Sequence, residues 1–192
     1  MKPGLLPAVV MSFAAAWGQQ IPVEGRADSA VRVLVFEDLQ CSDCAAFRRM
    51  MDEKLLPRYG ATVCFVHRDF PLAKHAWARK AAIAARYFDA IKPELGLEFR
   101  RTTFRRLAGI SRSGFDRHLA GFAGEHAVDP AQALAALSDE RLAALVEKDF
   151  QEGVARGVSK TPTVFVNGTP FVETFTFEEI SAAIERALAE NR

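Results

Sequence analysis

The chain of 192 residues has little of several features that would narrow its function at once. It has only three cysteines and a formal net charge of +1. Three cysteines in a chain of this length exclude a disulfide-rich scaffold, which needs more cysteines in a shorter chain. A net charge near zero gives no electrostatic reason to expect a nucleic acid or an anionic membrane surface as a partner. The composition, with 49% hydrophobic and 26% charged residues, predicts an ordinary globular protein with one good core.

Long apolar runs are also scarce, and the one that stands out lies at the N-terminus. An apolar stretch from Leu5 to Trp17 follows a single lysine and has small residues near its end. This pattern is typical of a secretory signal peptide, which we place at residues 1–16. The run is short for a permanent membrane anchor, and no later stretch is long and apolar enough, so we expect no stable membrane insertion. The polar residues 17–30 then predict a tether, while a cytosolic apolar tail is the alternative for the first segment.

One short segment departs from the balanced charge. Four arginines lie within residues 100–106, in the order Arg-Arg-Thr-Thr-Phe-Arg-Arg. We interpret this segment as a solvated helix face, because a binding role for such a patch needs support from the charge of the whole domain.

Two of the three cysteines form the segment Cys41-Ser42-Asp43-Cys44, between a β-like run and a helical pattern. The spacing allows a small disulfide ring at the start of a helix. There the free N–H groups and the positive end of the helix dipole stabilise a thiolate, which lowers the pKa of the first cysteine. The segment therefore predicts a dithiol–disulfide redox site.

Half of a zinc site is the alternative for two cysteines at this spacing. A zinc site needs a second pair of ligands, and Cys64 and the four histidines show no finger-like spacing to supply it. We therefore predict no metal. Cys64 lies in a β-rich run, where a small buried apolar side chain is favoured over a reactive odd thiol. His67 and His75 are interpreted as ordinary histidines rather than as groups that tune a cysteine pKa.

The order of the predicted elements defines the fold class. An apolar strand at 31–36, a helix that ends at Pro57 and a strand at 61–67 indicate a parallel pair in a right-handed β-α-β unit. Residues 73–156 show only helical patterns. A strand at 163–166, the hairpin turn Asn167-Gly168 and a returning strand follow. Thr176 and Glu179 form a capping box that starts the last helix.

This order and three separated motifs resemble the DsbA-like family of extracytoplasmic thiol–disulfide oxidoreductases. The motifs are the Cys-Ser-Asp-Cys segment, Arg-Asp-Phe-Pro-Leu at 68–72, and Ser-Lys-Thr-Pro-Thr-Val-Phe-Val-Asn-Gly at 159–168. The resemblance implies an α/β, thioredoxin-like domain formed by residues 31–72 and 157–192, with an all-helical insertion at 73–156.

The resemblance also implies roles for single residues. Cys41 would be the nucleophile, Cys44 the resolving cysteine, and Thr161-Pro162 the cis-proline segment that binds the substrate peptide. No metal or organic cofactor is implied, because the reactive group is the Cys41–Cys44 disulfide itself. The implied partners are cysteine-containing exported proteins and a membrane-bound or soluble redox recycling partner, in the periplasm or another extracytoplasmic compartment.

The chain departs from the family pattern in two places, which makes Ser42, Asp43 and Glu37 candidates for tuning a cysteine pKa. Ser42-Asp43 replaces the more familiar proline pairs, and an acid beside the nucleophile predicts a raised Cys41 pKa and a weaker oxidant. Many thioredoxin-like proteins have a buried acid six residues before the first cysteine, where this chain has Val35. Water or Glu37 would then accept the proton of the resolving step.

Three functions are compatible with these observations. A disulfide donor to exported proteins is the first choice, and a reductase or isomerase of such proteins is the second. A non-enzymatic peptide-binding or chaperone module on the same fold is the alternative from another class. The direction of electron flow depends on the redox potential and on the recycling partner.

Overall fold

The computed structural model describes residues 22–191. The predicted signal peptide at 1–16 and the first part of the predicted tether lie outside these residues. The strands are β1 (Val23–Gly25), β2 (Arg32–Glu37), β3 (Cys64–Asp69), β4 (Thr163–Val166) and β5 (Thr169–Val172). The helices are α1 (Ser42–Met50), π-helical η1 (Met51–Leu55), α2 (Leu56–Tyr59), α3 (Ala78–Ile91), α4 (Pro93–Arg106), 3₁₀-helical η2 (Leu107–Gly109), α5 (Phe115–Glu125), α6 (Pro130–Ala135), 3₁₀-helical η3 (Ala136–Ser138), α7 (Glu140–Ala155) and α8 (Phe177–Glu190).

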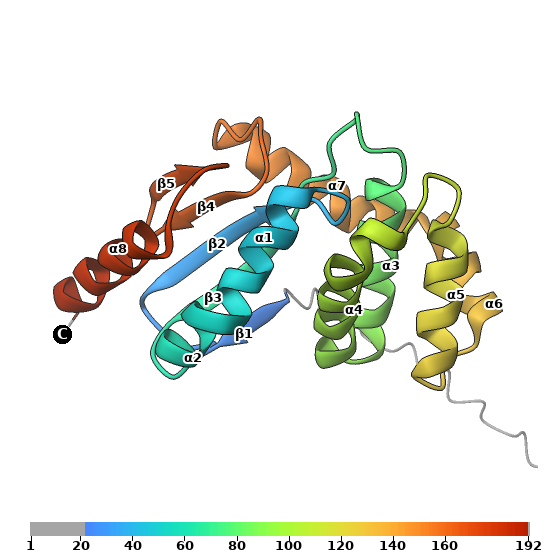
Figure 1. The fold of residues 1–192 in the computed structure, drawn as a ribbon, viewed down its shortest axis with the longest axis horizontal. Helices are drawn as coiled ribbons and strands as arrows, with labels where there is room; N and C mark the ends of the chain where they lie inside the picture. Colours follow the sequence, from blue (N-terminus) through green and yellow to red (C-terminus); the bar gives the residue numbers. More distant parts are fainter. Residues whose placement is uncertain (1–21, 192) are drawn as a thin grey trace, which may run out of the picture.

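The five strands form one mixed sheet in the order β1-β3-β2-β4-β5 (Figure 1). Strands β2 and β3 are parallel, as the β-α-β unit predicts, and the remaining neighbours are antiparallel. The turn Asn167-Gly168 joins β4 to β5, with positive φ at both residues. Thr176 and Glu179 make both hydrogen bonds of the predicted capping box. The predicted thioredoxin-like fold with helices inserted between its two halves is confirmed.

The part of the predicted tether that the structure describes is not free. Val23–Gly25 form the edge strand β1, which pairs antiparallel with β3, so the prediction is wrong there. A three-residue strand gives no readable alternation in the sequence. It is held by its neighbour and by the buried Glu24 carboxylate, which forms ion pairs with Arg48 of α1 and Arg101 of α4.

The first helix also differs from its prediction. It does not end at Pro57 but continues through the π-helical turn Met51–Leu55 to Tyr59. Pro57 lies in the first turn of α2. The π-helical turn resets the hydrogen-bonding pattern, and a proline is tolerated in a first helical turn because the missing N–H has no partner to lose there.

The core on the α1 and α8 side of the sheet is apolar. Buried valines and phenylalanines of the sheet pack against Phe47, Met51 and Leu55 and against Ile180 and Ile184 of α8. A smaller cluster includes Phe36, Phe70 and Phe165, with Phe150 of α7 stacked on Phe70.

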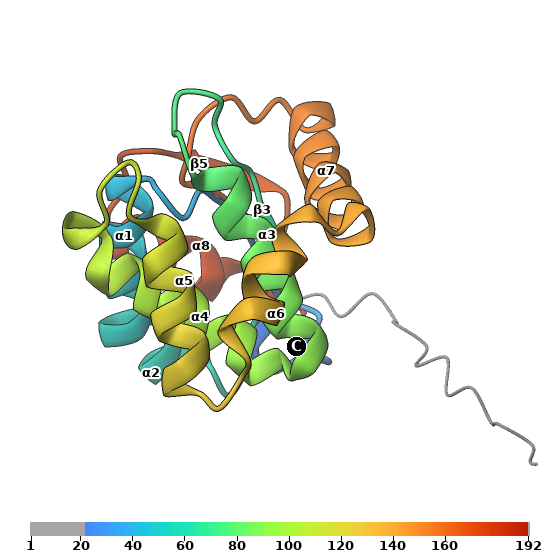
Figure 2. The ribbon, with the colours of Figure 1, turned by 90° about the vertical axis from the view of Figure 1, so that its right-hand side faces the viewer.

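The inserted helices lie beside the sheet and pack around a core of their own (Figures 1 and 2). Its aromatic members include Phe88, Phe99, Phe115 and Phe122. The same contiguous cluster contains Trp77, Cys41 and Cys44. The insertion therefore packs directly against the two cysteines. Within residues 22–191, none of the helices has the length and apolarity needed to cross a membrane.

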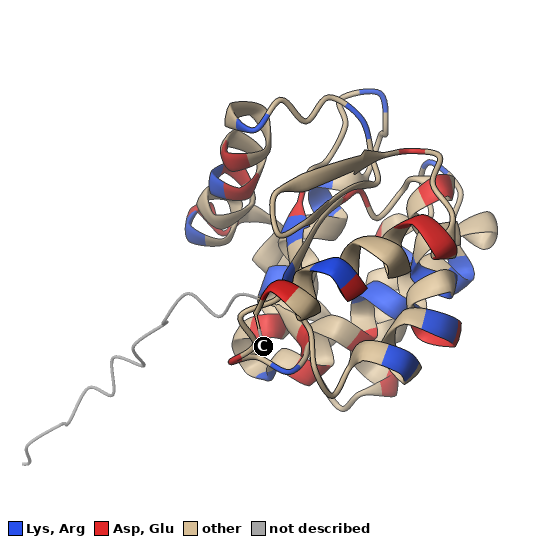
Figure 3. Cartoon of the chain, turned by 90° about the vertical axis from the view of Figure 1, so that its left-hand side faces the viewer, with Lys and Arg blue, Asp and Glu red and all other residues tan. Residues whose placement is uncertain are grey.

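The predicted solvated face at 100–106 is wrong for its first arginine. Arg100 is 1% exposed, and its guanidinium lies 2.6 Å from Asp69 Oδ1 and 3.4 Å from Glu37 Oε1. It belongs to a buried group that we call the arginine cluster, with members Glu37, Asp69, Arg86, Asp89, Arg100 and Asp149. Elsewhere, basic and acidic residues are interspersed along the helices in the view of Figure 3.

Candidate active site

The two cysteines lie where β2 ends and α1 begins. Cys41 is the N-cap residue of α1, with extended backbone angles of φ −87° and ψ 127°. Its carbonyl accepts the first helical hydrogen bond, from Ala45 N at 3.1 Å, and its own N–H donates to Asp38 O at 3.0 Å. The Cys41 side chain therefore sits at the helix start that the sequence predicts, beside the unpaired N–H groups of the first turn.

The surroundings of Cys41 stabilise its thiolate. Its pKa is lowered to about 6, chiefly by a hydrogen bond from the Cys44 thiol. Burial opposes this shift, and the backbone N–H groups of Cys44 and Asp43 and the side chain of Thr161 add to it. The prediction of a raised Cys41 pKa is wrong, because the hydrogen bonds to the sulfur lower this pKa. Asp43 is exposed, and it contributes through its backbone N–H, which points along the helix axis towards the N-cap.

Cys44 differs from Cys41 in both its burial and the direction of its pKa shift. It is 1% exposed, and its pKa is raised well above the ordinary value of a thiol by burial and by the nearby Cys41 sulfur. The Asp38 N–H donates to its Sγ at 3.4 Å. A thiol that is buried and difficult to ionise beside one that ionises readily suits two different steps of one exchange reaction.

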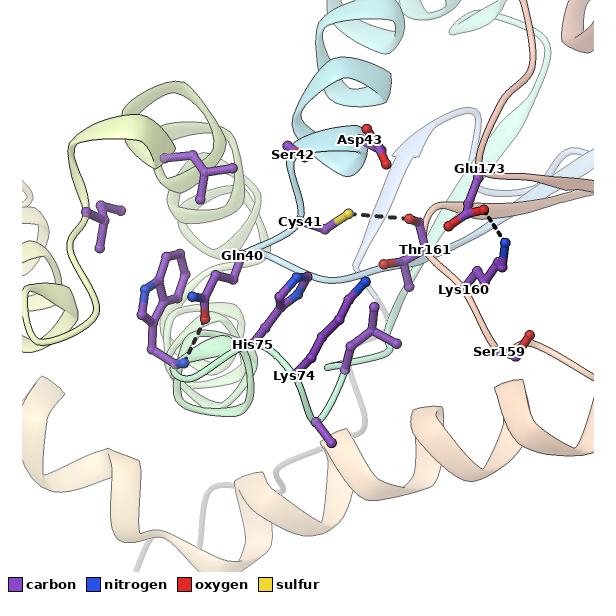
Figure 4. A pocket seen from close by; sticks show the side chains of 15 residues that line it. Gln40, Cys41, Ser42, Asp43, Lys74, His75, Ser159, Lys160, Thr161 and Glu173 are labelled. Atoms are coloured by element: carbon purple, nitrogen blue, oxygen red, sulfur yellow. Dashed lines mark hydrogen bonds and ion pairs between the residues drawn. The ribbon is translucent and has the colours of Figure 1, made fainter.

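The predicted cis-proline segment lies against Cys41. The Thr161–Pro162 peptide bond is cis, as predicted. The Cys41 thiol donates to Thr161 O at 3.3 Å (Figure 4). Residues 120 positions apart meet because β4 runs antiparallel to β2, which places Thr163 opposite Phe36. The start of β4 and the end of β2 therefore share one end of the sheet.

A cavity of about 570 Å³ opens beside Cys41. Its walls come from four segments: the start of α1 with the residue before it, the β3–α3 connection, η2 with the residue after it, and the cis-proline loop with the residue after β5. Figure 4 shows Cys41 and Thr161 on one side, with His75 and Lys74 next to them. The lining residues are Gln40, Cys41, Ser42, Asp43, Leu72, Ala73, Lys74, His75, Trp77, Leu107, Ile110, Ser159, Lys160, Thr161 and Glu173.

Four of the lining residues form two pairs that the sequence does not reveal. Gln40 Oε1 accepts a hydrogen bond from Trp77 N at 2.7 Å, which ties the β2–α1 loop to the start of α3. Lys160 forms an ion pair with Glu173 at 2.7 Å, which joins the cis-proline loop to the residue after β5.

Not every candidate lies at the cavity. Ser42, Asp43 and Thr161 line it, whereas Glu37 is buried behind it. Glu37 Oε1 lies 3.1 Å from His67 Nδ1, and its charge is among the causes that raise the Cys44 pKa. His67 is thus a satisfied buried histidine, as predicted.

Asp38 and His75 form a pair that the sequence does not predict. Asp38 Oδ2 lies 2.8 Å from His75 Nδ1, and His75 lines the cavity. The only available signal was their position, three residues before Cys41 and just after the motif at 68–72.

Cys64 takes no part in this arrangement. It is fully buried in β3, and burial raises its pKa, which agrees with the predicted apolar role. Among residues 22–191, His, Cys, Asp and Glu form no group that could hold a metal ion.

Comparison with known proteins agrees with this geometry. A family model described as "Thioredoxin" matches residues 19–186. The chain belongs to this thioredoxin family. A curated relative, the Na(+)/H(+) antiporter NhaA of Herminiimonas arsenicoxydans, is 27% identical over 164 residues, which are 85% of this chain and 25% of that protein. The chain thus spans about a quarter of the length of the curated relative it matches.

Solved structures of DsbA-like proteins have the same fold. Oxidised BdbD from Bacillus subtilis is 23% identical, with a TM-score of 0.75 over 88% of this chain and 93% of that one. Alpha-DsbA1 from Wolbachia pipientis is 15% identical, with a TM-score of 0.78 over 91% and 96% of the two chains. DsbA from Chlamydia trachomatis is 19% identical, with a TM-score of 0.72 over 88% and 92%. The predicted resemblance to the DsbA-like fold is confirmed.

Proposed function

We propose that this protein is an extracytoplasmic thiol–disulfide oxidoreductase that donates the Cys41–Cys44 disulfide to cysteines of exported proteins. The observation that supports this most is the contrast between the two thiols. Cys41 has a pKa lowered to about 6 and lines a cavity, whereas Cys44 is buried with a raised pKa. A client thiolate therefore has access to one sulfur of the pair and not to the other.

The reaction has two exchange steps. A client thiolate attacks Cys41 Sγ, the Cys41–Cys44 bond breaks, and Cys44 leaves as a thiolate that takes up a proton. A second client thiolate then attacks the client sulfur of the mixed disulfide. Cys41 leaves, and the client has lost two electrons that the protein has gained. A low pKa makes Cys41 a good leaving group in this second step.

The lowered Cys41 pKa also favours donation over reduction. A thiolate that the protein stabilises makes the reduced form more stable, and a stable reduced form makes the disulfide a stronger oxidant. This reverses the argument for a weak oxidant that starts from the charge of Asp43. A recycling partner, membrane-bound or soluble, would then take the two electrons from the reduced Cys41/Cys44 pair and pass them to an acceptor.

The cavity supports a peptide as the substrate. It places Cys41 beside Thr161 and the cis bond to Pro162, where an extended client segment can lie along the loop. The proposal needs no metal or organic cofactor, because the disulfide accepts both electrons. The extracytoplasmic location rests on the predicted signal peptide, and N-terminal sequencing of the mature protein from cell fractions tests it.

The equilibrium potential of Cys41/Cys44 in a glutathione buffer tests the donor role. We expect a value above about −180 mV, and a value near −270 mV would indicate a reductase instead. The matched variants are Cys41→Ser, which should abolish exchange, and Cys64→Ala, which should retain it. If Cys41→Ser still binds client peptides as the wild type does and the wild type exchanges no thiols, the protein is a binding module.

A further inference from the structure

The mechanism requires a proton partner for Cys44. Its thiol is 1% exposed and its pKa is raised, so the thiolate that leaves during donation is unstable until it is protonated. At this exposure the sulfur has little direct contact with bulk water. Val35, in the position where many thioredoxin-like proteins have an acid, is a fully buried apolar residue of β2. The proton must therefore come through another group.

Glu37 is poorly suited to that task. Its carboxylate lies between the His67 ring, 3.1 Å away, and the Arg100 guanidinium, 3.4 Å away. Burial would lower the pKa of His67, but Glu37 and Glu24 outweigh it and raise that pKa to about 9. Glu37 thus pairs with two cationic groups in the interior, and it does not line the cavity.

Asp38 differs in both its partners and its position. Its backbone N–H donates to Cys44 Sγ at 3.4 Å, so the residue touches the reacting sulfur. Its carboxylate is fully buried and accepts hydrogen bonds from Gln40 N and Leu72 N, each at 2.7 Å. Its ion-pair partner within residues 22–191 is His75, at 2.8 Å, rather than an arginine or lysine.

His75 connects this carboxylate to the cavity. Its side chain is 20% exposed and lines the cavity beside Cys41 (Figure 4). Burial raises the pKa of Asp38, although its hydrogen bonds from Leu72, His75 and Gln40 oppose the shift. An imidazole is the side chain best able to exchange protons with water near neutral pH.

We propose that Asp38 and His75 form the proton relay of Cys44. During donation His75 supplies the proton that Cys44 takes up as the Cys41–Cys44 bond breaks, and Asp38 orients the ring and balances its charge. In the reverse step the Cys44 thiol gives its proton to the pair, its thiolate attacks Cys41 Sγ of the mixed disulfide, and the client sulfur leaves as a thiolate. Asp38 is a positioning residue in this scheme. The inference rests on the proposed exchange activity and adds the residues that set its rate.

The relay has charged neighbours on every side. The titratable and charged groups around it are Glu37 of β2, Cys41, Asp43 and Cys44 at the start of α1, Lys74 of the β3–α3 connection, and Lys160 and Glu173 of the cis-proline side.

A purely structural role is the competing explanation. The bonds from Leu72 and His75 to Asp38 join the β2–α1 loop to the β3–α3 connection, as the bond between Gln40 and Trp77 also does. Loss of such a purely structural link between the two loops would affect stability or the shape of the cavity. It would not change the proton dependence of one chemical step.

The experiment separates two phases of one reaction. Reduced protein is mixed with glutathione disulfide between pH 5 and 9, quenched in acid and analysed by mass spectrometry. The first phase forms the mixed disulfide at Cys41, and the second closes the Cys41–Cys44 ring with loss of the Cys44 proton. His75→Gln keeps an N–H donor for Asp38 but cannot transfer the proton, and His126→Gln removes an exposed ring on α5 as the matched control.

We expect ring closure in His75→Gln to be slower by about tenfold or more at neutral pH, as for the loss of a general acid–base group. The difference in ring-closure rate between His75→Gln and the wild type should become smaller at high pH, where hydroxide takes the Cys44 proton. The rate of the first phase, the formation of the mixed disulfide, should stay within about twofold of the wild-type rate after correction for the Cys41 thiolate fraction. In His75→Ala, added imidazole should restore ring closure, because the deletion enlarges the cavity at that point.

The failures are distinguishable. If the wild type shows no first phase, the proposed exchange function is wrong. If the wild type shows both phases, and His75→Gln closes the ring at the wild-type rate with an unchanged pH profile, the relay is wrong. The contacts of Asp38 then have only a structural role. Equal slowing of both phases without rescue by imidazole would also overturn the relay.

Discussion

Glu37 and Asp38 are adjacent in the chain and both are buried, yet their carboxylates have different kinds of partner. Glu37 belongs to the arginine cluster, where Arg100 lies between three acids from different elements. Asp38 pairs with His75, which reaches the cavity. The ion pairs of the arginine cluster join β2, β3, α3, α4 and α7 in the interior. A carboxylate beside a partly exposed histidine can take part in proton transfer.

The largest effect should follow from breaking the arginine cluster. Arg100→Ala removes one of the two cations that face each of the buried carboxylates Asp69 and Glu37, and we expect the free energy of unfolding to fall by about 3–5 kcal/mol. Urea denaturation measures it. Arg105→Ala on the same helix is the control, because that side chain is 62% exposed and pairs at the surface, so it should cost less than about 1 kcal/mol.

The comparison becomes sharper when His75→Ala is measured in the same way. The Asp38–His75 bond is one partly exposed hydrogen bond, so its loss should cost only about 1 kcal/mol. A loss as large as that of Arg100→Ala would mean that both acids serve the structure alone.

An effect of intermediate size should appear in the pH dependence of stability. The pKa of His67 is raised to about 9 in the folded protein, against 6.5 for an ordinary histidine. Its stabilisation is fully present below pH 6.5 and is lost as the pH rises towards 9. Between pH 7 and 8.5 the unfolding free energy should therefore fall by about 2 kcal/mol more with His67 than with Gln at this position. Both proteins are studied as Cys41→Ser, so that the Cys41 thiol does not titrate.

The smallest effect is expected from an exposed charge beside the site. The thiolate absorbance of reduced protein at 240 nm should titrate with a midpoint near pH 6, because the Cys41 pKa is lowered to about 6. Asp43→Asn should leave this midpoint almost unchanged, since the backbone N–H of that residue, which the substitution keeps, is what contributes. A clear drop in the midpoint would show that the Asp43 carboxylate opposes the thiolate.

How much of the site the sequence predicts depends on the distance between interacting residues in the chain. Cys41 and Cys44 lie within one helical turn, and their contrast follows from which of them begins the helix. Thr161-Pro162 is found through the family motif rather than through any contact with Cys41. Asp38 and His75 are 37 positions apart, and neither belongs to a periodic pattern, so no local rule pairs them.

The order of the elements, the cysteine pair at the start of α1, the hairpin at Asn167-Gly168 and the capping box at Thr176 can all be predicted from the sequence. Each depends on spacing within a few residues, where backbone geometry and hydrophobic periodicity act. Only the tertiary structure decided that β1 joins the sheet, that Arg100 is buried, and that Glu37 and Asp38 face different partners. These outcomes depend on contacts between residues that are far apart in the chain. For a buried charge, the groups that replace water around it set the free-energy cost of its burial.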